Sequence, residues 1–258
     1  MLERGGGGAD DRPFMFGIYR YAVSVVNKLG NRVFGGVDFN RNGEMRELLK
    51  IIKSSGAGEF NVLDVGANGG HWARSALSLD GRVRCFCFEP IRPFFERIER
   101  SDPRLRAFNV GLGERDETLF AYQSGGGGSL IEEKQSKGKE NARHSVEIKN
   151  GDEFVSSLGL GDVGFVKVDV DGTEIRVLRG LAGTIGKFQP AVQFEFGYYN
   201  YLAGDSFYKY FKFFKNIGYD VFCVTRFGIS KIKRYKYMAS EIPINLNYLA
   251  VPGGRKIS

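Results

Sequence analysis

The chain has 258 residues, of which 42% are hydrophobic and 26% charged, with a formal net charge of +7 at pH 7. This balance excludes a disordered chain and predicts a globular protein with one large domain and a substantial core. The basic excess permits an acidic partner such as nucleic acid, an anionic glycan or a membrane surface, but solvated surface charge explains it more simply.

Three cysteines, Cys85, Cys87 and Cys223, have neither the number nor the spacing of a disulfide framework or a zinc site. No apolar run approaches the ~18 residues of a membrane-spanning helix, and no secretory signal with a cleavage site is present. We therefore expect a reducing, cytoplasmic environment.

The first part of the chain is expected to precede the main domain, which spans residues 59–258. Residues 1–12 contain four consecutive glycines and predict a flexible leader. Residues 13–58 predict a helical segment, with helices near residues 14–29 and 43–54. The first helix is amphipathic and in the simplest interpretation covers a sheet edge or a dimer surface; attachment to a membrane surface is the alternative.

An apolar run at residues 60–65 predicts a buried strand, and the glycine-rich turn after it leads into a helix that begins near His71. Glycines let the backbone approach a ligand closely, because they carry no Cβ, and a helix N-terminus offers free N–H groups. A second strand at residues 83–88 ends at Glu89, about 20 residues beyond the turn, where nucleotide-binding α/β folds place an acid on the ribose hydroxyls. The sequence therefore predicts a nucleotide-type cofactor at this edge of a sheet.

The residues of the turn favour one cofactor over another. The third glycine of the dinucleotide motif G-x-G-x-x-G is missing, and Asp64, at the end of the first strand, would repel a pyrophosphate. A carboxylate suits a ligand with a cationic end, such as the amino group of a methionine moiety. The pattern therefore favours S-adenosylmethionine over NAD, and a glycine turn in some other α/β sheet is the alternative.

The next stretch predicts a helix at residues 92–100 and a third strand at residues 105–110. Gly111 then opens a turn that could lie along an adenine ring at the carboxyl edge of the sheet. Residues 118–122 and 145–148 alternate like the two strands of a hairpin. The glycine-rich, polar stretch between them predicts either a mobile loop that closes over an acceptor or a surface connection without function.

The last part of the chain predicts further strands that alternate with helices, which implies a parallel or mixed α/β sheet. A strand at residues 163–170 ends in a dense acidic turn, and a strand at residues 189–196 carries Glu195 near its end. Residues 231–237 alternate with an exposed basic face and predict a solvated hairpin edge. The other expected elements are a helix with an aromatic face at residues 207–215 and strands at residues 219–225 and 245–251, which are expected to pair antiparallel.

Four motifs follow one another along the chain. They are Asp-Val-Gly-Ala-Asn-Gly-Gly at residues 64–70, Phe-Glu-Pro at 88–90, Lys-Val-Asp-Val-Asp-Gly-Thr-Glu at 167–174, and Phe-Glu at 194–195. In this order they resemble the motifs of the FkbM family of S-adenosylmethionine-dependent methyltransferases. The resemblance implies a class I methyltransferase fold, a Rossmann-like single α/β domain with a seven-stranded, mostly parallel sheet and helices on both faces. It also implies methyl transfer to a hydroxyl, often of a sugar or a polyketide-like product.

The resemblance carries site residues with it. Asp64, Gly66, Asn68 and Gly70 would line the methionine part of the cofactor, Glu89 would accept both ribose hydroxyls, and the acidic turn with Asp169 would face the reacting centre. Two residues depart from the family pattern and leave the acceptor side open. Asp171 replaces a glutamate, and His71 stands where the family often has a small or acidic residue.

Methyl transfer to a hydroxyl requires alignment, exclusion of water and a proton acceptor. Asp169 is the first candidate for this base, because it ends a central strand beside the predicted cleft; Glu174, Glu195 and His71 are the alternatives. Acids in the first turn of a helix also stabilise the helix, so Asp171 and Glu174 have an equally good structural interpretation. A divalent ion on the acidic cluster is conceivable but not favoured, so no metal ligands are assigned.

The expected partner is a hydroxylated small molecule or a glycan acceptor, while contact with a membrane surface and a homo-oligomer stay open. A nucleic-acid methyltransferase is the rival enzyme class, but the chain has no Asn/Asp-Pro-Pro-Tyr/Phe motif and no appended RNA-binding module. The non-enzymatic alternative is a cofactor-binding scaffold that assembles with glycosyltransferases.

Overall fold

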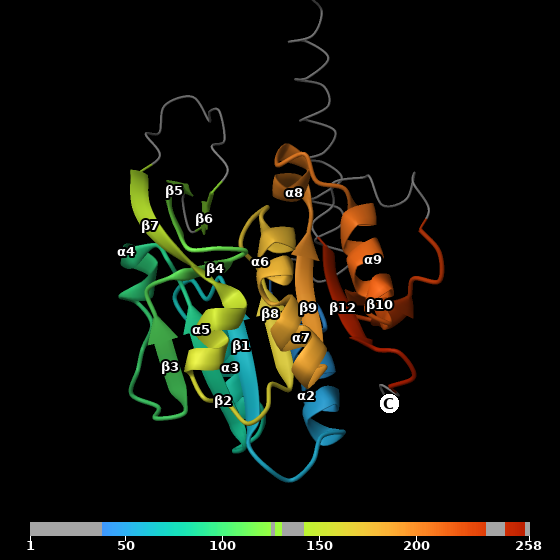
Figure 1. Cartoon of the computed structure of the whole chain (residues 1–258). Coiled ribbons are helices and arrows are strands. Elements are labelled where there is room, and N and C mark those ends of the chain that lie inside the picture. Colours follow the sequence, from blue (N-terminus) through green and yellow to red (C-terminus); the bar gives the residue numbers. More distant parts are fainter. Residues whose placement is uncertain (1–37, 125–126, 131–141, 236–245, 256–258) are drawn as a thin grey trace, which may run out of the picture.

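The computed structural model describes residues 38–124, 127–130, 142–235 and 246–255. In these residues a large sheet lies between two layers of helices, with a smaller sheet at one end (Figure 1). The predicted leader, the helix expected at residues 14–29 and most of the stretch between the two hairpin strands lie outside the described residues.

The large sheet has eight strands within the described residues, in the order β11-β10-β12-β9-β8-β1-β2-β3. Strands β1, β2, β3, β8 and β9 run parallel, whereas β10, β11 and β12 pair antiparallel with their neighbours. The bounds are β1 (Phe60–Val65), β2 (Val83–Phe88), β3 (Leu105–Phe108), β8 (Phe165–Val168), β9 (Ala191–Phe196), β10 (Tyr219–Thr225), β11 (Gly228–Lys231) and β12 (Leu246–Pro252).

Seven strands were expected, and this number was wrong. The structure has an eighth strand, β11, at the edge of the sheet beside β10. The reason is an early chain reversal: Thr225 pairs with Gly228, and Gly228 has a φ of 141°, a region that favours glycine. Of the basic stretch predicted as a hairpin edge, β11 includes only Lys231, whose ammonium lies 2.7 Å from Asp220.

The chain order in the sheet reverses beside β1. From β1 the chain continues to β2 and β3 on one side, and it later fills the other side with β8 and β9. The register places Val65, Phe88 and Val168 side by side, so the carboxyl ends of β1, β2 and β8 meet at one edge. Open α/β sheets bind their ligands in the crevice at such a reversal.

Helices cover both faces of this sheet, as expected. One face packs on α2 (Glu44–Lys53) and α3 (His71–Leu79), which bury Leu48, Ile52 and Ala76. The helix predicted at residues 43–54 is therefore present, and it belongs to the core of the sheet. The other face packs on α5 (Gly151–Ser157), α6 (Glu174–Gly180), α7 (Ala182–Phe188) and α9 (Phe207–Asn216).

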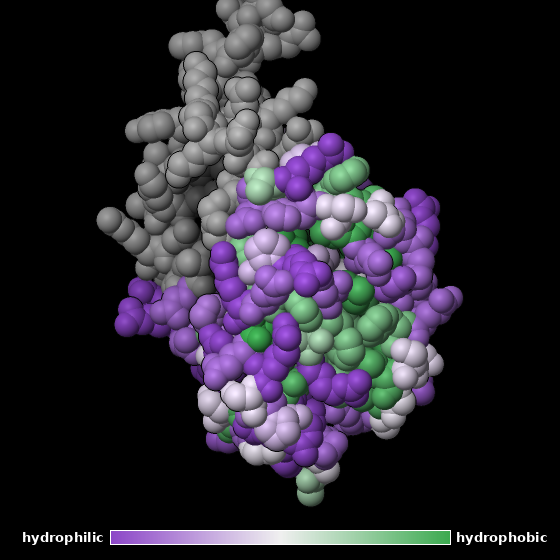
Figure 2. Space-filling view, turned by 90° about the vertical axis from the view of Figure 1, so that its left-hand side faces the viewer, coloured by the Kyte–Doolittle hydropathy of each residue, from purple (hydrophilic) through white to green (hydrophobic). Residues whose placement is uncertain are grey.

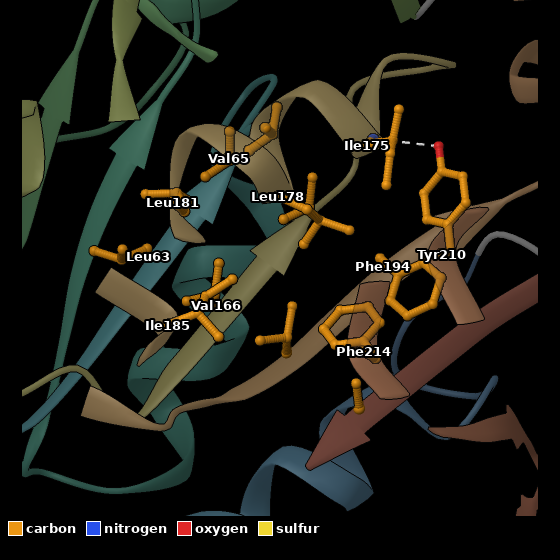
Figure 3. Close-up of a cluster of buried hydrophobic side chains, with 14 of the residues drawn as sticks. Leu63, Val65, Val166, Ile175, Leu178, Leu181, Ile185, Phe194, Tyr210 and Phe214 are labelled. Atoms are coloured by element: carbon orange, nitrogen blue, oxygen red, sulfur yellow. Dashed lines mark hydrogen bonds between the residues drawn. The ribbon is translucent and has the colours of Figure 1, made fainter. Parts of the chain in front are cut away.

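Aromatic and branched side chains interlock in the second of these cores (Figure 3). Leu178 of α6 lies over Val166 of β8, and the fully buried Phe194 stacks on Tyr210, with ring centroids 5.5 Å apart. The Tyr210 hydroxyl also accepts a hydrogen bond from the Ile175 N–H at 3.3 Å. The predicted aromatic face of α9 is thus part of the core.

A second sheet lies above the carboxyl ends of β1 and β2 (Figure 1). Its order is β4-β7-β5-β6, with bounds β4 (Gly111–Gly113), β5 (Glu117–Ser124), β6 (Gly127–Ser129) and β7 (Ala142–Asn150). The predicted hairpin is present, since β5 and β7 pair antiparallel. The turn predicted at Gly111 is instead the strand β4, which pairs parallel with β7. A Cβ at Gly111 would lie 2.6 Å from Ile148 Cδ1, so a larger residue here would require the Ile148 side chain to move.

The edge strand β3 is partly covered by α5. Phe108 packs on Phe88 and Phe154, with ring centroids 5.4 and 5.2 Å away. The side of the molecule that carries this edge is mostly hydrophilic, with hydrophobic residues gathered in one area (Figure 2). No helix in the part of the chain that the structure describes is both long and apolar enough to cross a membrane.

Candidate functional site

A pocket lies at the carboxyl edge of the large sheet, beneath the small sheet. It holds about 600 Å³ of space free of protein atoms, including solvent at its mouth. Its walls come from the glycine turn after β1, the loop after β2, the small sheet and the acidic turn after β8. Its lining includes Gly66, Asn68, Glu89, Ile91, Phe94, Gly111, Leu112, Ser129, Asp169 and Asp171.

The glycine turn is held close to the end of β8. Gly66 has a φ of 84°, and a Cβ on this residue would lie 1.8 Å from the carbonyl oxygen of Asp169. Asn68 also has a positive φ, 48°, and its side-chain oxygen accepts the Gly69 N–H at 2.7 Å. Gly66 therefore allows the glycine turn to contact the start of the acidic turn after β8, and Asn68 stabilises the glycine turn from within.

Replacing Gly66 with alanine is expected to destabilise the protein by about 2 to 3 kcal/mol, because the new Cβ combines an unfavourable φ with a backbone clash. The measurement is the free energy of unfolding in urea. Gly58→Ala is the matched control, since nothing lies within 4 Å of a Cβ there. Equal stability of the two variants would contradict the tight contact between the turn and Asp169.

Glu89 follows β2 and faces the turn across the pocket. Its two carboxylate oxygens accept the N–H groups of Asn68 and Ile91, each at 2.8 Å, while the Asn109 amide holds the Glu89 carbonyl at 2.9 Å. The side chain is buried, and burial raises the pKa of Glu89 to about 7 against the opposing effect of the two backbone N–H groups. This carboxylate is fixed in place and ready to accept further hydrogen bonds.

The acidic turn after β8 forms the opposite wall. Asp169 lies directly after β8, and its side chain is 37% exposed, whereas that of Lys167 beneath it is 7% exposed. Burial acts to raise the pKa of Asp169, but Lys167 and a hydrogen bond with Glu195 outweigh it and hold the pKa below its usual value. Asp169 is therefore an ionised carboxylate on the pocket wall at neutral pH.

Asp171 has a left-handed backbone, with a φ of 51°, and its carbonyl oxygen accepts the Ser129 hydroxyl at 2.6 Å. This bond ties the acidic turn to the small sheet. Burial, followed by repulsion from Asp169 and Glu174, raises the pKa of Asp171 to about 8. A carboxyl group with this pKa is mostly protonated at neutral pH, so it can both donate and accept hydrogen bonds.

Two of the predicted bases lie outside the pocket wall. Glu174 is only 1% exposed, and its carboxylate accepts the N–H groups of Val170 and Gly172 and the Asn200 amide, which fixes the acidic turn. Glu195, on β9, hydrogen-bonds to Asp169. Burial and the charge of Asp169 raise the pKa of Glu195 well above its usual value, so it is a protonated neighbour of Asp169.

Three further candidates are placed away from the pocket. Asp64 is fully buried beneath the turn, with the Lys167 ammonium 3.5 Å from its carboxylate. Gly70 has a φ of 73° at the start of α3, where Ile98 packs against it. His71 is exposed on the outer side of α3 and hydrogen-bonds to the Arg74 guanidinium. The structure thus brings Gly66, Asn68, Glu89, Gly111 and Asp169 together, and leaves Asp64, Gly70, Glu174, Glu195 and His71 outside the pocket lining.

Sequence reasoning missed Ser129, Lys167 and Glu44 as residues of the site and its support. The signal for Lys167 was a lysine within an otherwise apolar strand. No comparable signal existed for Ser129, which follows a glycine run. No group of three His, Cys, Asp or Glu side chains is arranged to hold a metal ion among the residues that the structure describes.

The chain is similar to known methyltransferases. The family profile described as "Methyltransferase FkbM domain" matches residues 64–221. The 2-O-methyltransferase NoeI of Sinorhizobium fredii is 29% identical over 143 residues, which cover 49% of this chain and 59% of NoeI. The AMB antimetabolite synthetase AmbE of Pseudomonas aeruginosa is 28% identical over 159 residues, which cover 46% of this chain and 8% of AmbE. The chain therefore spans less than two thirds of either relative.

Among solved structures, the methyltransferase FkbM from Methylobacillus flagellatus KT is similar, with a TM-score of 0.48 and 14% identity. The match covers 78% of this chain and 47% of that one. The family match extends over more than half of the present chain and includes the motifs at the pocket. This protein therefore belongs to the FkbM family of S-adenosylmethionine-dependent methyltransferases, and the resemblance predicted from its motifs is confirmed.

Proposed function

We propose that this methyltransferase acts on a hydroxyl group of a sugar or glycoconjugate. The observation that carries the proposal is the pairing, in one pocket, of a fixed carboxylate on the cofactor side, Glu89, with an ionised carboxylate on the opposite wall, Asp169. The similarity to NoeI, a 2-O-methyltransferase, supports oxygen as the acceptor atom.

The residues of the pocket are suited to S-adenosylmethionine. Glu89 offers anchored carboxylate oxygens for the ribose hydroxyls, and the glycine turn leaves room for close approach because Gly66 has no Cβ. Ile91, Phe94 and Leu112 give an apolar wall for the adenine ring. When bound, the cofactor supplies a methyl group made electrophilic by its sulfonium.

Asp169 is the proposed general base. With the cofactor bound, Asp169 would accept the proton that the acceptor hydroxyl loses as its oxygen takes the methyl group. An ionised carboxylate can do this across the neutral range, because its pKa lies below the usual value. Asp171, with a raised pKa, is suited to hold a neighbouring hydroxyl of the acceptor, which favours a polyol or sugar.

The first test is calorimetric titration with S-adenosylhomocysteine. Glu89→Ala is expected to weaken binding by about 10- to 100-fold, because the ribose hydroxyls lose a charged acceptor. For the wild type, binding is expected to be about tenfold weaker at pH 6 than at pH 8. The reason is that Glu89, with a pKa of about 7, is mostly protonated at the lower pH and mostly ionised at the higher one.

The matched control is Glu96→Ala, since Glu96 is an exposed carboxylate nearby that pairs only with Arg92 among the described residues. It should bind like the wild type at both pH values. Wild-type affinity in Glu89→Ala, in a well-folded protein, would exclude the proposed ribose contact. The acceptor is then sought by transfer of labelled methyl to a panel of sugars and oligosaccharides, and labelling of plain RNA but no sugar would overturn the carbohydrate proposal.

A further inference from the structure

A lysine is buried directly beneath the pocket. Lys167, on β8, is 5% exposed, and its ammonium lies 3.0 Å from Asp169 Oδ2 and 3.5 Å from Asp64 Oδ1. It also lies 5.6 Å from the centre of the Trp72 ring. A buried ammonium is costly unless opposite charges and hydrogen bonds compensate it, so this position needs an explanation.

The strand register explains how the lysine came to lie between two acids. Asp64 of β1 lies opposite Lys167 of β8 in the parallel ladder, and Asp169 follows two residues after Lys167, directly after the end of β8. Asp64 is completely buried, and no other polar group among the described residues hydrogen-bonds to its carboxylate. Burial raises the pKa of Asp64, and the neighbouring Lys167 ammonium opposes this shift. Lys167 is therefore the group that favours an ionised carboxylate at position 64.

A second buried carboxylate holds the far side of this cluster. Glu44 of α2 accepts the Trp72 indole N–H at 2.9 Å and the Asn247 amide at 2.9 Å, and it also accepts the Gln193 amide. These bonds join α2, α3, β9 and β12 below the pocket. Glu44 and Asn247 lie outside the segment that matches the family profile, so the support of the site extends beyond that segment.

We propose that Lys167 is a positioning residue, whose ammonium, fixed between Asp64 and Asp169, aims the Asp169 carboxylate at the pocket and keeps it charged. The role follows from the distances and the burial, and it is distinct from contact with cofactor or acceptor. Burial alone would lower the pKa of Lys167, but Asp169, Asp64 and Glu44 outweigh it and raise the pKa, so the lysine stays charged throughout the neutral range.

Several other groups act on Asp169, and all but one are acidic. The titratable or charged groups that interact with it are Glu44, Asp64, Lys167, Asp171, Glu174 and Glu195. Without the lysine, Asp169 would face only carboxyl groups in a poorly solvated site. Proton uptake by Asp169 would then relieve the repulsion.

The test measures the ionisation of Asp169 itself, in the full chain without ligand. Aspartate ¹³C-carboxyl NMR spectra are recorded from pH 3 to 8, and Asp169→Asn assigns the Asp169 signal. In Lys167→Met the titration midpoint of the Asp169 carboxyl signal is expected to rise by about one to three pH units. In Lys167→Arg this midpoint should stay within about half a pH unit of the wild-type value. Lys149→Met is the control, because Lys149 pairs with the exposed Asp116 and is remote from the cluster.

Lys167→Met leaves Asp64 buried without a compensating charge and could fail to fold, so Asp64→Asn/Lys167→Met is prepared as well. In this double variant the fold is relieved of the stranded charge, but the Asp169 midpoint is still expected to be raised. An unchanged midpoint in either folded variant would overturn the proposal. The proposed role of Lys167 rests on the proposed role of Asp169 as the general base. The NMR titration needs neither cofactor nor acceptor, so either proposal can fail without the other.

Discussion

Replacing Asp169 with asparagine is expected to lower methyl transfer by about 100- to 10 000-fold, which is the usual contribution of a general base. Asparagine has nearly the shape of aspartate but cannot accept the proton of the hydroxyl. S-adenosylhomocysteine, which carries no sulfonium charge, is expected to bind within about threefold of the wild-type affinity. The loss should therefore lie in kcat and not in cofactor binding.

The measurement is transfer of labelled methyl from S-adenosylmethionine to the best sugar acceptor found, with saturating cofactor. Asp38→Asn is the control, since Asp38 is an exposed aspartate of the loop before α2. Glu195→Gln gives the decisive comparison. Glu195 is protonated and hydrogen-bonds to Asp169, so glutamine, which is also a donor, should retain most activity. Activity that survives in Asp169→Asn but disappears in Glu195→Gln would move the base to Glu195.

Seven strands of the large sheet were predictable, because they are largely apolar runs bounded by turns. The edge strand β11, Gly-Ile-Ser-Lys, was not predictable, because it is partly exposed and has no such run. The helix α2 was predictable too, because buried Leu48 and Ile52 recur at helical spacing. The strands β4 and β6 were not, since they are short and consist of glycines with Leu112 or Ser129, without any apolar alternation. The pairing of such strands depends on tertiary contacts: β4 pairs with β7 at Ile148, and β6 pairs with β5.

The pocket itself was predictable from one principle. Parallel strands end at the same edge of a sheet, so the residues that follow β1, β2 and β8 had to meet, and Gly66, Glu89 and Asp169 do line one pocket. The buried contact between Asp64 and Lys167 beneath the pocket was not predictable, because it depends on strand register. Asp64 was expected to touch the methionine part of the cofactor, yet the ladder sets it opposite Lys167.

The direction of side chains explains the other differences. His71 was a candidate base because of its chemistry, but as the first residue of α3 it lies on the exposed face of that helix. Glu174 was a candidate with an equally good structural interpretation. Its carboxylate is directed back at the turn that precedes α6, and we propose that it positions the turn.

Glu174→Ala is accordingly expected to cause the largest loss of stability, about 3 to 5 kcal/mol. The carboxylate accepts hydrogen bonds from the Val170 and Gly172 N–H groups and from the Asn200 amide. Without it, both backbone N–H groups would be left unsatisfied in a buried site, and the Asn200 amide would keep only the Tyr210 hydroxyl as an acceptor among the described residues. Leaving a buried donor without its acceptor costs about 1 to 3 kcal/mol for each donor, with incomplete additivity. In a chain of this size the expected fall in Tm is roughly 10 °C.

Thermal unfolding and urea unfolding, both without ligand, measure this effect. Glu147→Ala is the matched control, since Glu147 is an exposed carboxylate, 65% exposed, whose pairing with Lys149 at 3.8 Å should contribute less than about 1 kcal/mol. The stability of Glu174→Gln should lie between those of Glu174→Ala and Glu147→Ala. The glutamine oxygen can still accept the backbone N–H groups, but the glutamine NH₂ group would face another hydrogen-bond donor. If Glu174→Ala were as stable as the control and lost only methyl transfer, Glu174 would belong among the bases, and the acidic turn would hold its shape without it.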